Sequence, residues 1–160
     1  MKQMLSLLFG LLVMSGSMPL RAQKQDNSYL LNLHTIGSSG AAVRAVRDFL
    51  KREGDGKEEK WYRTKQGFLA EFDQGGRVGQ YFYDQKGNWG YSILTFGERG
   101  LPDEIRRLVR STYFEYSILW VKQVTGVQGF SYVVHIDNTG SWKELLIHDG
   151  EMAEWKAFDN

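Results

Sequence analysis

Three histidines are the side chains of this sequence best suited to acid–base chemistry or to metal binding. His34 has no acidic neighbour close in sequence, and His148 stands beside Asp149 where a turn is expected. His135 and Asp137 alternate along one expected strand, so both side chains point to the same face. A metal centre needs about three or four converging ligands. We therefore expect polar surface groups here, with no metal site and no cofactor.

The motifs that position a catalytic nucleophile or a phosphate are also missing. No Gly-x-Ser-x-Gly sequence occurs, and residues 37–40 suit a loop and a helix cap instead. Residues 75–79 are rich in glycine but lack the Lys-Ser/Thr pair of a phosphate loop. The acidic pairs at 58–59 and 103–104 fall in a charged turn and at a helix start, which explains them structurally. We therefore expect that the protein is not an enzyme.

The N-terminus has the pattern of an export signal. Lys2 precedes an apolar run of about 11 residues, followed by small and turn-forming residues and a cleavage position after Ala22. The run is too short for a membrane span, which needs about 20 residues. The alternative is a buried N-terminal helix. We expect residues 1–22 to be a signal peptide and the protein to be periplasmic or secreted, with no membrane span in the mature chain.

Composition narrows the classes of partner. The chain has no cysteine, which excludes disulfides, thiol catalysis, Cys-ligated metals and a lipid-bearing Cys. Without the signal, which holds Lys2 and Arg21, 18 basic side chains stand against 19 acidic ones. A near-neutral surface of mixed charge indicates neither nucleic-acid binding nor binding to an anionic membrane.

The remaining chain predicts a helix followed by four strands, twice. The first helix covers 41–52, with Ser38 or Ser39 as its cap and Gly54 at its end; the second starts at Pro102. Period-two runs separated by turn residues predict strands at 60–64, 67–73, 77–84, 88–96, 115–124, 129–137, 141–148 and 151–158.

This order of elements predicts an α+β fold with antiparallel sheet. We expect a lead-in segment at 23–40, extended near residues 29–33 or disordered, and then a single domain at 41–160. The domain would consist of two tandem repeats, 41–97 and 101–159, because residues 68–76 can be laid over 132–140.

Several motifs together resemble a known family. They are Glu59-Lys60-Trp61-Tyr62, Gly67-Phe68-Leu69-Ala70-Glu71-Phe72, Tyr83-Asp84-Gln85-Lys86-Gly87-Asn88-Trp89, Leu101-Pro102-Asp103-Glu104-Ile105-Arg106 and Tyr113-Phe114-Glu115-Tyr116-Ser117-Ile118. Over most of residues 41–158 the chain resembles the secreted PepSY-like, beta-lactamase-inhibitor-like proteins of Bacteroidetes. The resemblance implies tandem α/β repeats whose antiparallel sheets form one curved surface. It supplies no catalytic residues, and function does not follow from a shared fold.

The surplus of aromatic residues is the feature best suited to a function. We expect the helices to cover the face that holds Phe68, Ala70, Phe72, Tyr132, Val134 and Ile136, with Phe82 as a further candidate. The opposite face would then show Arg63, Glu71, Tyr81, Tyr83, Val133, His135 and Trp142. Tyrosine and tryptophan are favoured where a surface is buried against a partner. The alternatives are a second packing layer and scattered exposed aromatics.

The function expected from the sequence is therefore an exported, non-enzymatic module that binds a protein or peptide of the cell envelope. Its candidate binding residues are Arg63, Tyr81, Tyr83, His135 and Trp142. One alternative is an inhibitor or regulator of a secreted hydrolase, either a peptidase or a beta-lactamase. Another is a carrier of a small ligand, either a glycan or a lipid.

Overall fold

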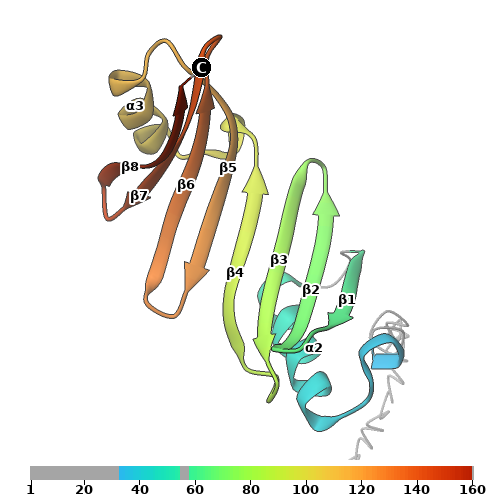
Figure 1. The fold of residues 1–160 in the computed structure, drawn as a ribbon. Helices are drawn as coiled ribbons and strands as arrows, with labels where there is room; N and C mark the ends of the chain where they lie inside the picture. The colour runs from blue at the N-terminus through green and yellow to red at the C-terminus, as the bar shows by residue number, and fades with distance from the viewer. Residues whose placement is uncertain (1–32, 55–57, 160) are drawn as a thin grey trace, which may run out of the picture.

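The computed structural model of the chain describes residues 33–54 and 58–159 (Figure 1). The expected signal peptide at 1–22 lies outside the described residues, as does most of the expected lead-in segment at 23–40. Residues 33–36 are helical, so an extended segment does not reach Leu33. Ile36 is buried and belongs to the hydrophobic core.

The first complete helix, α2, spans Gly40–Glu53 and agrees with the predicted range. The Ser39 hydroxyl oxygen accepts a hydrogen bond from the backbone N–H of Ala42, 3.2 Å away, which satisfies one free donor of the first turn. Gly54 ends the helix with a positive φ of 75°. The apolar stripe of α2 is buried, with Val46 and Phe49 fully inaccessible.

The second helix, α3, is shorter and spans Asp103–Thr112, after the 3-10 turn η1 at Glu98–Gly100. Pro102 is its N-cap, so the helix begins one residue after the predicted start, and Asp103 in its first turn suits the positive end of the helix dipole. The Glu98 carboxylate joins η1 to α3, because the Arg110 guanidinium lies 2.8 Å from it.

Eight strands form one antiparallel sheet in sequence order, β1 to β8. Their bounds are β1 Glu59–Arg63, β2 Gly67–Gln74, β3 Arg77–Asp84, β4 Trp89–Phe96, β5 Ser117–Gly126, β6 Gly129–Asp137, β7 Ser141–His148 and β8 Glu151–Asp159. The expected α+β class with antiparallel sheet is therefore confirmed. Figure 1 shows α2 beside the first strands and α3 near the last ones.

Helices α2 and α3 lie on the same face of the sheet. Directly paired residues share a face, and the pairs run from Tyr81 to Ser92, from Ser92 to Thr125 and from Thr125 to Phe130. The Tyr81 ring packs edge-on against Phe49 of α2, with ring centroids 5.3 Å apart. At the other end of this row, Phe130 lines a pocket together with residues of α3. We call this side the covered face and the opposite side the open face.

The core fills the space between the helices and the covered face. As expected, this face carries Phe68, Ala70, Phe72, Tyr132, Val134 and Ile136, all buried. Phe49 of α2 lies at the centre of an aromatic cluster with Trp61, Phe72 and Tyr81. Each edge-to-face pair of this kind stabilises the fold by about 0.5–1.5 kcal/mol beyond the effect of burying its area.

Within residues 33–54 and 58–159, no helix is both long and apolar enough to cross a membrane.

Candidate functional site

Four rings form a stacked row on the open face, each on a different strand of β5 to β8. The row consists of Trp120, His135, Trp142 and Phe158, and we call it the aromatic row. Ring centroids are 4.8 Å apart from Trp120 to His135, then 5.4 Å to Trp142 and 6.2 Å to Phe158. The angles between ring planes stay between 9° and 29°. The row is preorganised because each ring restricts the rotation of the next.

Charged side chains surround the aromatic row. The Glu144 carboxylate lies 3.1 Å from Lys156 Nζ and 4.0 Å from His135 Nδ1. Among the described residues, that buried imidazole nitrogen has no hydrogen-bond partner. The Lys122 ammonium stands 4.8 Å from the centroid of the Trp120 ring, within cation–π range. The row therefore combines apolar rings with an exposed cation, Lys156, next to a largely buried carboxylate.

A second aromatic stack lies on the open face in the first half of the sheet. Phe82 and Tyr91 are directly paired on β3 and β4, with parallel rings 4.4 Å apart. Tyr62 and Leu69 continue the same row of paired residues toward β1. Tyr91 of the stack is 42% exposed, and Tyr62, at the β1 end of the row, is 43% exposed. This row of paired residues therefore presents an apolar surface to solvent.

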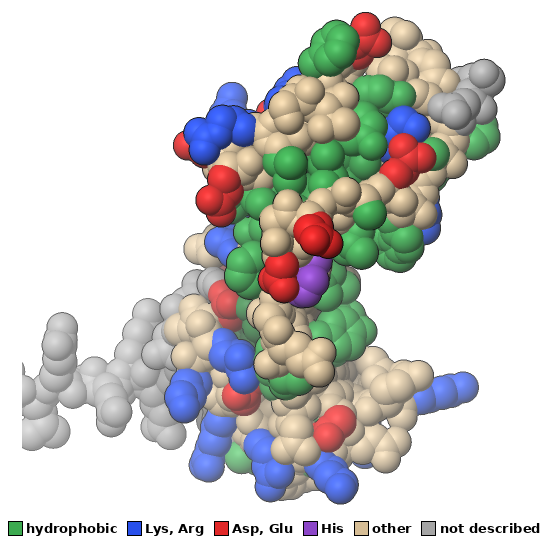
Figure 2. Space-filling model, turned by 90° about the vertical axis from the view of Figure 1, so that its left-hand side faces the viewer, with side chains coloured by type: hydrophobic (Ala, Val, Ile, Leu, Met, Phe, Trp, Pro, Cys, Tyr) green, Lys and Arg blue, Asp and Glu red, His purple; other side chains and the backbone are tan. Residues whose placement is uncertain are grey.

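The exposed face of α2 is rich in basic side chains. In Figure 2 many Lys and Arg side chains lie at the lower end, where α2 lies, and others appear on the upper part, where hydrophobic side chains are also exposed. The exposed face of α2 supplies Arg44, Arg47, Lys51 and Arg52. The helix beside the first strands therefore presents a basic surface to solvent.

Two of the five candidate residues lie on the open face, as predicted. His135 and Trp142 are neighbours in the aromatic row and both are partly buried. Their role in binding remains a prediction.

The predicted positions of Tyr81 and Tyr83 are wrong. Both side chains lie on the covered face, where only 5% and 3% of their surfaces are exposed. Tyr81 packs on Phe49 and its hydroxyl donates a hydrogen bond to the Glu53 carboxylate. Tyr83 packs on Trp61, and burial, followed by the nearby Asp48 carboxylate, raises the pKa of Tyr83. Neither tyrosine is available to a partner.

The positions of Phe82 and Arg63 also differ from expectation. Phe82, a candidate for the covered face, stacks on Tyr91 on the open face. Arg63 is paired with Phe68 and so lies on the covered side, at the edge of the sheet. Its guanidinium is 6.0 Å from the Phe68 ring centroid. Arg63 is exposed, but it lies on the side opposite to His135 and Trp142.

Sequence reasoning did not select Trp120 and Phe158 as site residues. The strands were predicted, but a bulge between Ile118 and Trp120 places both Ile118 and Val121 on the covered face. Trp120 consequently pairs with His135 on the open face. The sequence does contain a signal for Phe158. It lies directly opposite Trp142 in the last hairpin, which β7 and β8 form.

Comparison with known proteins shows the fold. No protein-family model matches the sequence, and no curated protein is significantly similar to it. A DUF2874 family protein from Bacteroides uniformis matches 72% of this chain and 87% of its own, with 12% identity and a TM-score of 0.57. A BLIP-like protein from Bacteroides fragilis matches with 18% identity, coverages of 72% and 84%, and a TM-score of 0.56.

A third solved structure, of a protein described as a candidate periplasmic protein from Bacteroides eggerthii, matches at 11% identity. The match covers 72% of this chain and 86% of that one, with a TM-score of 0.56. These structures confirm the resemblance to the BLIP-like proteins of Bacteroidetes at the level of the fold.

Groups of three or more potential metal ligands do not occur among the described residues.

Proposed function

We propose that the protein is an exported, non-enzymatic binding module that holds a protein or peptide partner on the open face of its sheet. The aromatic row carries this proposal: four stacked rings on adjacent strands, on a face that neither helix covers. Buried aromatic anchors supply most of the binding energy in many interfaces. The proposed site now contains Trp120, His135, Trp142 and Phe158, and omits Arg63, Tyr81 and Tyr83.

The geometry of the row favours a polypeptide over a glycan. A sugar packs on the free face of an aromatic ring, whereas the faces in this row cover one another. The ring edges and the neighbouring Lys156–Glu144 pair are what a partner would meet. Apolar edges beside a polar pair fit the mixed composition of protein interfaces.

Export is part of the proposal. It is supported by the signal-like pattern of residues 1–22 and by the structural neighbour from Bacteroides eggerthii, which is described as periplasmic. We also propose that residues 41–160 are one domain made of two repeats, 41–97 and 101–159. The repeat is supported by pairs such as Phe68 and Tyr132, which are 64 positions apart and buried on the same face.

Affinity capture with matched variants tests the proposal. Immobilised mature protein is exposed to an envelope extract of the producing cells, next to Trp142→Ala and the control Phe114→Ala. Phe114 is 75% exposed and belongs to no strand, so its removal keeps the row intact. A specific partner should bind at least about 30-fold more weakly to Trp142→Ala, which is the effect of a hot spot of about 2 kcal/mol.

Unchanged affinity of Trp142→Ala, with unchanged binding of Phe114→Ala, contradicts the assignment of the site. Urea unfolding of both variants shows whether each retains its fold. A glycan or a lipid in place of the captured protein would contradict the class of partner.

Inhibition of a secreted hydrolase is a second candidate function. It is favoured by one structural neighbour, the Bacteroides fragilis protein, which is described as BLIP-like. Rates of envelope peptidases and beta-lactamases are measured with the protein in excess at about micromolar concentration. A lower rate that returns with Trp142→Ala supports inhibition through the aromatic row, and unchanged rates count against it.

A further inference from the structure

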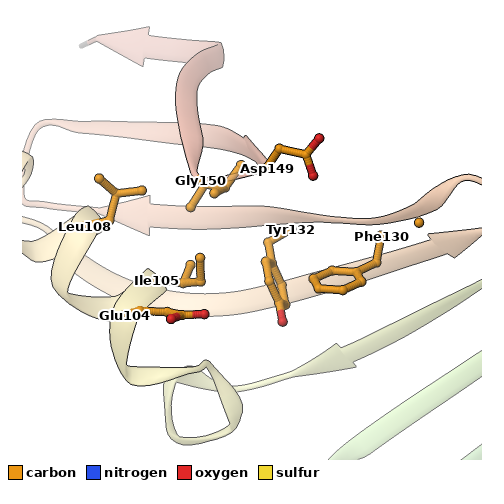
Figure 3. Close-up of a pocket in the computed structure, with 9 residues that line it drawn as sticks. Glu104, Ile105, Leu108, Phe130, Tyr132, Asp149 and Gly150 are labelled. Atoms are coloured by element: carbon orange, nitrogen blue, oxygen red, sulfur yellow. The ribbon is translucent and has the colours of Figure 1, made fainter.

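A pocket lies on the covered face of the sheet (Figure 3). The aromatic row lies on the opposite, open face. It has a volume of about 550 Å³ and opens between α3, strand β6 and the turn from β7 to β8. Its lining consists of Glu104, Ile105, Leu108, Gly129, Phe130, Tyr132, Ile147, Asp149 and Gly150. The volume falls in the range of about 300–1,000 Å³ typical of small-molecule sites.

The pocket exists because α3 does not reach the turn from β7 to β8. In the first half of the sheet, α2 fills the corresponding space beside the turn from β3 to β4. In the turn from β3 to β4, Gly87 packs so closely that an added Cβ would lie 2.0 Å from the carbonyl oxygen of Ala41 in α2. Gly150, in the turn from β7 to β8, has nothing within 4 Å of the same position. The helix α2 has 14 residues and α3 has 10. The second half is therefore built with a vacant space beneath its turn.

Apolar side chains form the walls of this space. Ile147 and Tyr132 are buried in the sheet, at 1% and 7% exposure, and α3 contributes Ile105 and Leu108. Phe130 is 52% exposed, whereas Tyr132, the next residue on the same face of β6, is buried. The two rings pack edge-on, with centroids 5.6 Å apart. An apolar body of suitable size would cover Phe130 and gain from the removal of this surface from water.

The polar groups of the pocket are acidic. Glu104 and Asp149 are its only charged lining residues, and no Lys or Arg lines it among the described residues. Figure 3 shows Glu104 on the α3 side and Asp149 on the side of the turn. Glu104 forms no ion pair within residues 33–54 and 58–159, whereas Asp149 lies 3.4 Å from Nε2 of His148. Burial, together with the charge of Glu104, raises the pKa of Tyr132, another residue that lines the pocket.

We propose that this pocket binds a small organic cation with an apolar body. The apolar body would lie against Ile105, Leu108 and Tyr132, and the ammonium group would face Glu104. The arrangement disfavours anions, because two carboxylates flank the opening and, among the described residues, no Lys or Arg lines it. The proposal is independent of the proposed function, since the two sites lie on opposite faces of the sheet.

Tryptamine is the probe for this test, with tryptophol as its neutral counterpart and indole-3-propionate as its anionic one. Binding to the mature protein is followed by NMR titration, up to about 10 mM ligand because affinities of single small amines are low. Tryptamine should shift the resonances of the lining residues saturably and bind at least about tenfold more tightly than tryptophol.

Two variants and one control locate the site. Glu104→Gln should weaken tryptamine at least about fivefold and leave tryptophol unchanged, because only the ammonium group senses the carboxylate. Leu108→Trp should weaken both by filling the space. Glu115→Gln, at an exposed carboxylate outside the pocket, should change neither affinity.

The proposal is overturned if tryptamine causes no saturable shifts at the lining residues, or if indole-3-propionate binds as tightly as tryptamine. Loss of a captured protein by Leu108→Trp, without tryptamine binding to the native protein, would also overturn it and assign the pocket to a polypeptide. Failure of Trp142→Ala to affect a partner concerns the other face and leaves this test unaffected.

Discussion

The imidazole of His135 lies parallel to the indole of Trp120, with 4.8 Å between ring centroids and 9° between ring planes. Because the two residues are directly paired on β5 and β6, the sheet itself holds this stack. The contact is thus part of the folded protein before any partner arrives.

The stack should be measurable as a coupling energy. In a double-mutant cycle of Trp120→Ala and His135→Ala, we expect the two changes to be non-additive by about 0.5–1.5 kcal/mol in the free energy of unfolding. Urea denaturation measures each variant. Tyr62→Ala with His135→Ala is the control, since five strand spacings of about 4.8 Å separate β1 from β6 and their effects should add. Additivity within about 0.3 kcal/mol for Trp120 and His135 would contradict the coupling.

Removal of a hydroxyl group should affect the two buried tyrosines differently. Tyr81→Phe loses the hydrogen bond to the Glu53 carboxylate and should destabilise the protein by about 1–2 kcal/mol. The buried Tyr83 hydroxyl has no hydrogen-bond partner among the described residues. Tyr83→Phe should therefore leave stability unchanged or raise it by up to about 1 kcal/mol. Chemical denaturation of both variants tests the contrast, and a larger loss in Tyr83→Phe would refute it.

Stability should fall at alkaline pH. Burial raises the pKa of Tyr81, and burial with the Asp48 carboxylate raises that of Tyr83, whereas tyrosines of the unfolded chain ionise near about pH 10. Above that pH the unfolded state binds fewer protons than the folded state, so the free energy of unfolding decreases as pH rises. Each such tyrosine contributes up to about 1.4 kcal/mol per pH unit.

Other groups also titrate in this range, so Tyr83→Phe serves as the matched comparison. Urea midpoints are measured from about pH 8 to about pH 11.5 for both proteins. The variant should lose stability less steeply above about pH 10. Equal slopes for the two proteins would show that Tyr83 does not contribute.

Two glycines offer a matched pair of substitutions. Gly87 and Gly150 have φ angles of 79° and 81°, so Ala costs about 1 kcal/mol in backbone conformation at either position. Only Gly87 is packed against the carbonyl of Ala41. Gly87→Ala should thus be at least about 2 kcal/mol more destabilising than Gly150→Ala in thermal or urea unfolding. Equal losses of stability in the two variants would contradict this prediction. They would mean that the N-terminus of α2 shifts to make room for the added Cβ without a loss in the free energy of unfolding.

Most elements could be predicted because their local signals agree. Turn residues separate the strands within β1–β4 and within β5–β8, and Ser39, Gly54 and Pro102 mark the helix ends to within one residue. Each of these signals depends on a few neighbouring residues, which is why they were sufficient.

The faces of β3 were assigned incorrectly because aromatic residues occupy three consecutive positions, Tyr81, Phe82 and Tyr83. Alternation alone cannot choose between them, and a tyrosine hydroxyl suggests exposure. The deciding signal is the two-residue turn at 75–76, which pairs Gln74 with Arg77. Counting back from that turn places Tyr81 opposite Ala70, on the covered face.

The aromatic row was only half predictable for a different reason. Trp120 reaches the row through a bulge, where one extra residue shifts the alternation of β5. Leu119, 53% exposed, occupies the bulge. A bulge depends on packing across the sheet, which the local pattern of β5 does not encode. Predicting the aromatic row therefore requires the pairing of β5 with β6 to be known.

The order of the strands has a consequence for how the chain acquires its structure. Among the described residues, each strand pairs only with strands adjacent to it in sequence, and the longest connection is the one through η1 and α3. Forming the sheet therefore closes only short loops, and the entropic cost of bringing distant segments together is small. A chain delivered from one end can add each hairpin as it emerges, without waiting for the opposite terminus.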